Sequence, residues 1–201
     1  MATVPAMLPS AVGEVETMGS PARRLESARA KYPALGPPEI LIWREWLRLH
    51  EAEYAPLPDF WLAAAPTLTG STPQPGDIFD YNVRIGQGRD PGAGFDESVR
   101  QQWIARTKFR IDALGFDGQT PVIFEVDRNA SSPQVGQLLS YLATWRASKL
   151  PGTDPRGVLI TANFNANAMH LVRETGIQLV TVPVDFRVLS PYSNVDITGT
   201  E

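Results

Sequence analysis

The chain has no cysteine and only two histidines, His50 and His170. Without cysteine there can be no disulfide, no thiolate metal ligand and no cysteine nucleophile. Two imidazoles leave little material for histidine-rich metal sites or Ser-His-Asp catalysis, and we expect neither histidine to be catalytic. Any chemistry must therefore come mainly from carboxylate, amide, hydroxyl and basic side chains.

Long apolar segments are also missing. The longest apolar run, Phe60 to Ala65, is far shorter than the roughly twenty residues that a membrane span requires. Glu14 and Glu16 stand where a secretory signal would be apolar. We therefore expect no membrane partner, and a soluble protein made in the cytoplasm that either stays there or is assembled into a particle such as a virion.

Basic residues are not in excess. The chain carries 18 Lys and Arg against 22 Asp and Glu, a formal net charge of -4. Proteins that coat nucleic acid non-specifically need a surplus of cations to displace counterions. The balance argues against that class, while a local basic groove and DNA as a partner remain open.

Breaker residues divide the chain into three parts. Proline and glycine are dense before residue 39 and again in the loop 86–94. We expect residues 1–76 to form a Pro/Gly-rich arm plus an amphipathic helix, residues 77–185 an α/β core, and residues 186–201 an extended tail. The arm and tail are expected to contact other protein subunits in an oligomeric assembly, because segments of this composition gain order on binding.

Hydrophobic periodicity places the elements of the core. The fold class that it indicates is α/β, with a mixed central sheet flanked by helices. An Asp-Gly pair marks a hairpin turn within residues 115–118. The predicted strands cover residues 77–85, 107–114, 121–127, 158–162 and 177–184, and the predicted helices cover residues 39–54, 95–105, 134–149 and 166–175.

Alternation along the first hairpin strand gives each face its own character. Lys108, Arg110 and Asp112 are expected on one face, and Ile111 and Ala113 on the other. The polar face could therefore supply both a carboxylate and cations to a site.

The second hairpin strand places Glu125 and Asp127 on one face. Pairing of the two strands can bring Asp112 close to Glu125, provided that the register is correct. Two carboxylates and the carbonyl of Val126 can hold a hard divalent cation, which would activate water for phosphodiester cleavage.

The motifs around these carboxylates resemble the PD-(D/E)xK nuclease superfamily. They are Arg-Ile-Asp-Ala-Leu-Gly at 110–115 and Ile-Phe-Glu-Val-Asp at 123–127. Gln137 and Tyr141 fit the QxxxY signature of its exonuclease-like branch. The resemblance implies a restriction-endonuclease-like core with an N-terminal extension. It also implies Asp112 and Glu125 as Mg²⁺ or Mn²⁺ ligands, supported by Gln137 and Tyr141.

One residue departs from this pattern. The superfamily has a lysine where this chain has Asp127, so the cation that stabilises charge at the attacking water is lost. Lys108 is a candidate for a migrated lysine. Alternatively, Asp112 and Glu125 form ion pairs with Lys108, Arg110 or Arg128 and bind no metal. An additional acidic ligand from an early helix would be Glu39 or Glu97, and the sequence does not choose between them.

Aromatic and glycine-rich segments have simpler interpretations. Trp43, Trp46 and Trp145 fall on apolar helical stripes and are expected in the core. Gly86 to Gly94 lacks the full phosphate-loop pattern and is expected to be a flexible loop.

The leading functional hypothesis is a structural or interaction protein built on a catalytically degenerate nuclease-like fold. The lost lysine, the acidic charge and the breaker-rich ends favour a phage virion component, such as a head-to-tail connector or tail protein, with no cofactor. One alternative is an Mg²⁺- or Mn²⁺-dependent DNA nuclease. Another is a nucleic-acid-binding module without catalysis.

Overall fold

The structure is a computed structural model and describes residues 30–189. Residues 1–29 of the predicted arm and 190–201 of the predicted tail, which are expected to contact other subunits, lie outside the described residues. Within residues 30–189, no helix has the length and apolar character needed to cross a membrane. The elements are α2 (Pro37–His50), η1 (Glu51–Glu53), α3 (Asp59–Leu68), β1 (Asp80–Ile85), α4 (Glu97–Thr107), β2 (Phe109–Asp117), β3 (Thr120–Ala130), α5 (Ser132–Ala147), β4 (Arg156–Phe164), η2 (Ala166–Ala168), α6 (Met169–Thr175), β5 (Gln178–Thr181) and η3 (Phe186–Leu189).

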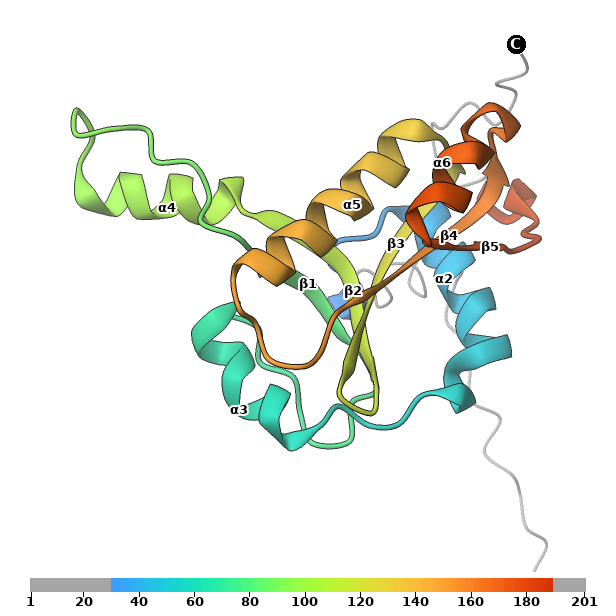
Figure 1. The fold of residues 1–201 in the computed structure, drawn as a ribbon, viewed down its shortest axis with the longest axis horizontal. Coiled ribbons are helices and arrows are strands. Elements are labelled where there is room, and N and C mark those ends of the chain that lie inside the picture. The colour runs from blue at the N-terminus through green and yellow to red at the C-terminus, as the bar shows by residue number, and fades with distance from the viewer. Residues whose placement is uncertain (1–29, 190–201) are drawn as a thin grey trace, which may run out of the picture.

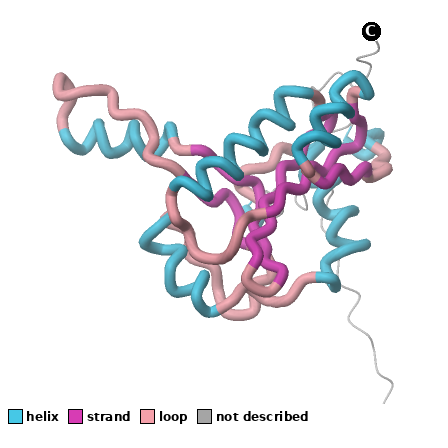
Figure 2. Tube along the Cα trace, in the orientation of Figure 1, coloured by secondary structure: helices cyan, strands magenta, loops and turns pink. Residues whose placement is uncertain are grey.

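One five-stranded sheet organises the molecule, in the spatial order β1-β2-β3-β4-β5. The pairs β1–β2 and β2–β3 are antiparallel, whereas β3–β4 and β4–β5 are parallel. The parallel pairs arise because α5 and then α6 carry the chain back across the sheet. The predicted mixed α/β sheet with flanking helices is therefore confirmed (Figures 1 and 2).

Each face of the sheet is covered by its own apolar core. Helix α2 lies on one side of the sheet, and α5 and α6 lie on the other (Figure 1). We call the two clusters the α2-side core and the α5-side core. The α2-side core includes Ile40, Trp43, Trp46, Phe79, Ala113, Val122, Phe124, Val126, Val158 and Ile160. The α5-side core includes Trp61, Val83, Ile85, Ile111, Leu114, Phe116, Ile123, Leu138, Tyr141, Trp145 and Leu159.

Helix α2 confirms the predicted amphipathic stripe. It begins with Pro37, which needs no intrahelical donor at that position. Ile40, Trp43 and Trp46 are buried against the sheet. The α-helix ends at His50, four residues before the predicted end at Tyr54. The short η1 turn follows it directly.

Helix α3 was not predicted from the sequence. Its apolar run is short and Pro66 lies inside it, a combination that usually argues against a helix. Tertiary packing stabilises it nonetheless: Trp61 is fully buried and stacks on Trp145, with ring centroids 5.5 Å apart. The Trp61 indole Nε1 also donates to Asp80 Oδ2 over 3.0 Å. Long-range contacts thus outweigh the local propensity.

The central hairpin differs from prediction at both ends. Strand β2 starts at Phe109, because Thr107 still belongs to α4. Gly115 lies within the strand instead of in a loop, and pairing continues to Asp117 opposite Thr120. The turn is therefore shorter than predicted and contains Gly118, whose φ of 60° suits a glycine.

The prediction also assumed regular alternation of the side chains along β2, and this assumption is wrong. Ile111 packs in the α5-side core and Ala113 in the α2-side core, so these two residues do not share a face. Opposite Asp112, Asn82 of β1 has a left-handed φ of 57°. The register pairs Tyr81 with Ala113 and Val83 with Ile111, which places this irregularity at Asp112. Local distortion of the two strands is the physical reason for the change of face.

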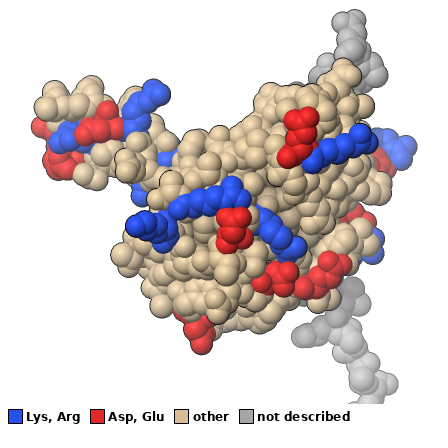
Figure 3. Space-filling view, viewed as in Figure 1, with Lys and Arg blue, Asp and Glu red and all other residues tan. Residues whose placement is uncertain are grey.

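Helix α4 and the loop that precedes it project from the body as an arm (Figures 1 and 2). No residue of α4 is buried. Acidic and basic side chains are interspersed on this arm (Figure 3). The predicted loop over residues 86–94 and the helix after it are thus present, but they pack little against the sheet.

Candidate functional site

The carboxylates Asp112 and Glu125 lie where strands β2 and β3 separate. The ladder between the strands runs from Asp117 opposite Thr120 to Ala113 opposite Phe124 and stops there. In place of the next ladder contact, the Asp112 side chain accepts the Val126 backbone N–H at Oδ2 over 2.9 Å. This bond satisfies a strand donor and keeps the Asp112 carboxylate between the strands.

Glu125 is buried and forms no ion pair with any described residue. Its side chain is 5% exposed, and its Oε2 has no hydrogen-bond partner among the described residues. Burial is the main reason that its pKa is raised well above the ordinary carboxyl range. The charges of Asp112 and Asp127 raise it further, and the nearby Tyr141 hydroxyl opposes them. A buried carboxylate of this kind favours either a proton or a cation.

The pKa of Asp112 is raised for similar reasons. Burial contributes most, the charges of Glu39 and Asp127 add to it, and the Val126 N–H and the Arg110 guanidinium oppose it. Asp112 and Glu125 therefore interact strongly, and in the absence of a cation they retain protons at a pH where ordinary carboxyl groups have lost them.

Neither carboxylate has the ion pair that the metal-free alternative requires. Among residues 30–189, no ion pair joins Asp112 or Glu125 to Lys108, Arg110 or Arg128. Arg128 stacks its guanidinium on the ring of Phe186 instead, 4.7 Å from the centroid, and its Nε is buried without a hydrogen bond.

Gln137 and Tyr141 form a hydrogen-bonded relay between α5 and β2. Gln137 Nε2 donates to the Tyr141 hydroxyl over 2.5 Å, and that hydroxyl donates to the carbonyl oxygen of Arg110 over 2.8 Å. Burial, followed by the charge of Glu125, raises the pKa of Tyr141, which keeps it a neutral donor. The pair thus fixes the backbone of β2 two residues before Asp112.

Asp127 occupies the position at which the resemblance expects lysine, and it has only neutral partners. Its Oδ1 accepts the Asn129 backbone N–H over 2.7 Å, and its Oδ2 accepts Gln134 Nε2 over 3.2 Å. Lys108 lies just before β2, at the junction with α4, and makes no ion pair with any described residue. The structure therefore places no lysine against Asp112 or Glu125 among the described residues.

Glu39 is the early-helix acid that the sequence could not select. It lies in the first turn of α2, and its charge acts on Asp112. Burial, and then the charge of Asp127, raises the pKa of Glu39. Glu97 lies instead on the projecting α4, where it pairs with Arg100. Only the packing of α2 on the sheet shows which of the two acids lies near Asp112.

The donor set fits a hard divalent cation. Asp112 and Glu125 offer carboxylate oxygens, one of them buried without a partner, and oxygen donors suit Mg²⁺ or Mn²⁺. Within residues 30–189, no three acidic or histidine side chains form a ready metal cluster. Backbone oxygen and water would have to complete the coordination, as Mg²⁺ commonly allows.

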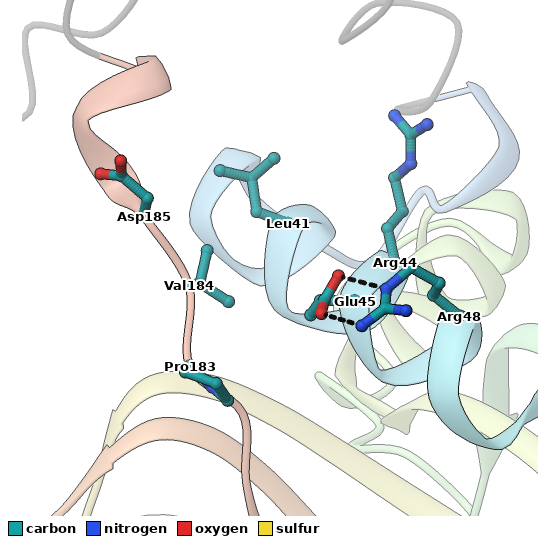
Figure 4. Close-up of a pocket in the computed structure, with 7 residues that line it drawn as sticks. All are labelled: Leu41, Arg44, Glu45, Arg48, Pro183, Val184 and Asp185. Carbon is teal, nitrogen blue, oxygen red and sulfur yellow. Dashed lines mark hydrogen bonds and ion pairs between the residues drawn. The ribbon is translucent and has the colours of Figure 1, made fainter.

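A surface pocket between α2 and the segment after β5 is a separate feature (Figure 4). Arg44, Glu45 and Arg48 line it from α2, and Arg48 is already paired with Glu45 over 2.7 Å. Asp185 lies on the opposite wall. None of the predicted site residues lines this pocket, so it has no part in the carboxylate site.

The remaining sequence features have mainly structural roles. Trp43, Trp46 and Trp145 are buried, as predicted. His50 contacts Glu53, with 2.9 Å between Nδ1 and Oε1, and His170 contacts the carbonyl of Asn167. Neither histidine contacts the carboxylate site.

No protein-family model matches the chain, and no curated protein is significantly similar to it. Similar solved structures include a repair endonuclease from Pyrococcus abyssi, with 23% identity, 36% of this chain and 32% of that chain covered, and a TM-score of 0.33. An EndoMS complex with double-stranded DNA has 23% identity over 50% of this chain and 39% of that chain, with a TM-score of 0.33. EndoMS in its apo form has 27% identity over 35% and 33%, with a TM-score of 0.31. The matched part thus spans less than half the length of each of these three proteins.

Proposed function

We propose that this chain is an Mg²⁺- or Mn²⁺-dependent nuclease that cleaves DNA. The observation that carries the proposal is the pair of buried carboxylates, Asp112 and Glu125, which lie next to each other and form no ion pair with any described residue. Burial of a carboxylate is costly unless a bound cation or a proton neutralises its charge. The motifs around the pair, on a mixed sheet of this order, favour phosphodiester cleavage over other metal-assisted hydrolysis.

Asp112 and Glu125 would hold the cation, with the carbonyl of Val126 as a further ligand. A bound cation of this type supplies Lewis-acid activation of water and of the phosphate under attack. Gln137 and Tyr141 position the β2 backbone beside the carboxylates. Asp127 adds negative charge where lysine is expected, which strengthens the attraction for a cation while removing a fixed positive charge.

The test combines metal titration with plasmid cleavage. Calorimetric titration of Mn²⁺ is expected to show binding to the native protein and to Glu97→Gln, and no binding to Asp112→Asn or Glu125→Gln. Mn²⁺-dependent nicking should be abolished by EDTA and fall more than about a hundredfold in the two site variants, because even outer-shell changes cost roughly 10- to 100-fold. Glu97→Gln is the control, since it removes one exposed acid on α4. Nicking that survives Glu125→Gln would reject this site.

A second candidate is a structural protein, such as a phage virion component, that keeps the fold without catalysis. The observation that favours it is Asp127 at the lysine position, with no lysine beside the carboxylates among the described residues. None of the three similar structures is described as a virion protein. Native protein that neither binds Mn²⁺ nor nicks DNA would favour this candidate over the nuclease.

A further inference from the structure

Two arginines lie directly opposite each other on strands β1 and β2. Arg84 and Arg110 are register partners, and like charges at such positions destabilise an antiparallel pair. Among residues 30–189, neither guanidinium makes an ion pair with a carboxylate. No other register pair in the described sheet brings together two charges of the same sign.

Arg84 and Arg110 differ in this respect from many other arginines of the chain, which form an ion pair with a carboxylate. The ion pairs of the described residues include Arg48–Glu45, Arg100 with Asp90 and Glu97, Arg146–Asp154, Arg156–Asp117 and Arg187–Asp185. The pair on β1 and β2 thus leaves two positive charges together without an ion-paired carboxylate among the described residues. An external anion would relieve their repulsion.

Arg110 is also held in place for binding. Its Nε donates to Asn82 Oδ1 over 2.7 Å, and its carbonyl accepts the Tyr141 hydroxyl over 2.8 Å. Asn82 adopts a left-handed φ of 57°, which asparagine tolerates better than most side chains. These contacts fix the backbone and one nitrogen of Arg110. Its two terminal nitrogens have no hydrogen bond to any described residue, so they can make a bidentate contact with phosphate.

The arginine pair lies close to Asp112. Val83, Ile85 and Ile111 pack in the α5-side core, so Arg84 and Arg110 point to the opposite side. Asp112 stands at the irregularity of the strand, and the Arg110 guanidinium is near enough to oppose the rise in the pKa of its carboxyl. Two residues along a strand correspond to about 7 Å, which makes the arginines close neighbours of the carboxylate site. The α2 side also holds Glu39, whose charge acts on Asp112.

We propose that Arg84 and Arg110 form a phosphate-binding pair that holds the DNA backbone beside Asp112. The inference rests on the proposed nuclease function and adds the residues that bind its substrate. The guanidinium groups take the phosphodiester next to the one under attack, and the DNA charge supplies the ion pair that no described carboxylate gives them. Asn82 is a positioning residue for Arg110.

Three further cations lie on or next to α4. Arg89, Arg106 and Lys108 have no ion pair with described residues. The Arg89 backbone N–H donates to Thr107 Oγ1 over 2.6 Å, so the loop before α4 is joined to the end of that helix. These cations can follow the backbone of a bound DNA away from the site.

The test measures DNA binding separately from cleavage. Full-length Glu125→Gln protein, which leaves DNA intact, is titrated into a fluorescent duplex over a range of salt concentrations. Arg84→Gln/Arg110→Gln is compared with Arg44→Gln/Arg173→Gln, which removes two exposed arginines that have no ion pair with described residues on α2 and α6. Both doubles lower the net charge equally. Asn82→Gly suits the left-handed φ and removes the side chain that accepts from Arg110 Nε.

Affinity is expected to fall at least about tenfold in Arg84→Gln/Arg110→Gln. The slope of log K against log salt should become shallower by about 2, because each lost phosphate contact removes roughly 0.9. The control double should keep the parent slope, and Asn82→Gly should lose part of the affinity. The melting temperature of Arg84→Gln alone should stay the same or rise, since a repulsion is removed.

Equal losses in the two double variants would overturn the inference, because net charge alone would then explain them. An unchanged slope in Arg84→Gln/Arg110→Gln would overturn it as well, and so would the absence of DNA binding by the parent. The cleavage assay of native protein decides the nuclease proposal independently: nicking with unaltered DNA binding in the arginine double would retain the nuclease and reject the phosphate pair.

Discussion

At the scale of single residues, the most informative feature is a pair of buried carboxyl groups with no ion pair to any described residue. Glu125 Oε2 has no hydrogen bond among the described residues, and Asp112 uses one oxygen to accept a backbone N–H. A purely structural carboxylate in such a place would normally be paired, because unpaired buried charge is costly. Such a carboxyl group keeps a proton or takes a cation, and the proposed nuclease uses the second state.

The first prediction concerns the pH dependence of stability in EDTA. Unfolded Glu125 loses its proton near the ordinary value of 4.5, whereas in the folded protein its pKa is raised. Above pH 4.5 the folded state therefore binds more protons than the unfolded state, and stability falls with rising pH, by up to about 1.4 kcal/mol per pH unit. Glu125→Gln removes this loss, so its advantage in melting temperature over native protein should grow from pH 5 to pH 8.

The matched control for this experiment is Glu97→Gln, whose carboxylate is exposed on α4. Its melting temperature should follow that of the native protein at each pH. An advantage of Glu125→Gln that stayed constant from pH 5 to pH 8 would contradict a raised pKa at Glu125.

At the scale of elements, helices α4 and α5 show opposite relations to the core. Helix α5 buries Val135, Leu138, Tyr141, Leu142 and Trp145, which confirms the predicted burial of Trp145. Helix α4 buries no residue. Even its large apolar side chain Trp103 is 49% exposed, and Phe95 just before the helix is 53% exposed. Local sequence is sufficient to predict both helices, but only one of them is stabilised by packing.

The second prediction concerns hydrogen exchange in these two helices. Local opening requires little free energy where few apolar contacts are lost. Backbone amides of Glu97–Thr107 are therefore expected to exchange at least about a hundredfold faster than those of Ser132–Ala147 in native protein, measured by mass spectrometry after pulse labelling. Equal protection of α4 and α5 would show that another contact stabilises α4. Repeating the exchange at lower protein concentration would then show whether that contact is with a second copy of the chain.

At the scale of the whole molecule, the site exists because two cores hold one distorted sheet. The α2-side core brings Glu39 toward Asp112, and the α5-side core brings Tyr141 toward Glu125. Strands β2 and β3 stop pairing between these two layers. A cation bound there would link elements from both faces, so binding should stabilise the entire fold.

The third prediction concerns that linkage. With Mn²⁺ at about 100 times its dissociation constant, binding to the folded state alone adds about 2.7 kcal/mol. For a chain of this size the melting temperature should then rise by about 5–10 °C relative to EDTA. Glu125→Gln should show no rise, while Glu97→Gln should respond like native protein. A similar rise in Glu125→Gln would mean that the metal binds elsewhere.

Much of the fold could be predicted from the sequence, because periodicity and turn residues act locally. The stripes of α2 and α5, the apolar strands β4 and β5 and the Asp-Gly turn all have short-range signals. Helix α3 and the extent of β2 could not be predicted, since the packing of Trp61 on Trp145 and the long hairpin ladder are contacts between distant residues. Alternation also failed at Asp112, where Asn82 distorts the neighbouring strand.

The sequence by itself determined the candidate chemistry of the site: oxygen donors at Asp112 and Glu125, an acid at 127 in place of lysine, and a Gln137–Tyr141 pair one helical turn apart. Tertiary structure alone decided which of these groups meet. It brought Glu39 rather than Glu97 near Asp112, left both central carboxylates without an ion pair among the described residues, and set Arg84 against Arg110. The reason is physical: residue identity sets charge and donor type, whereas burial, register and helix packing set the distances and the solvation on which binding depends.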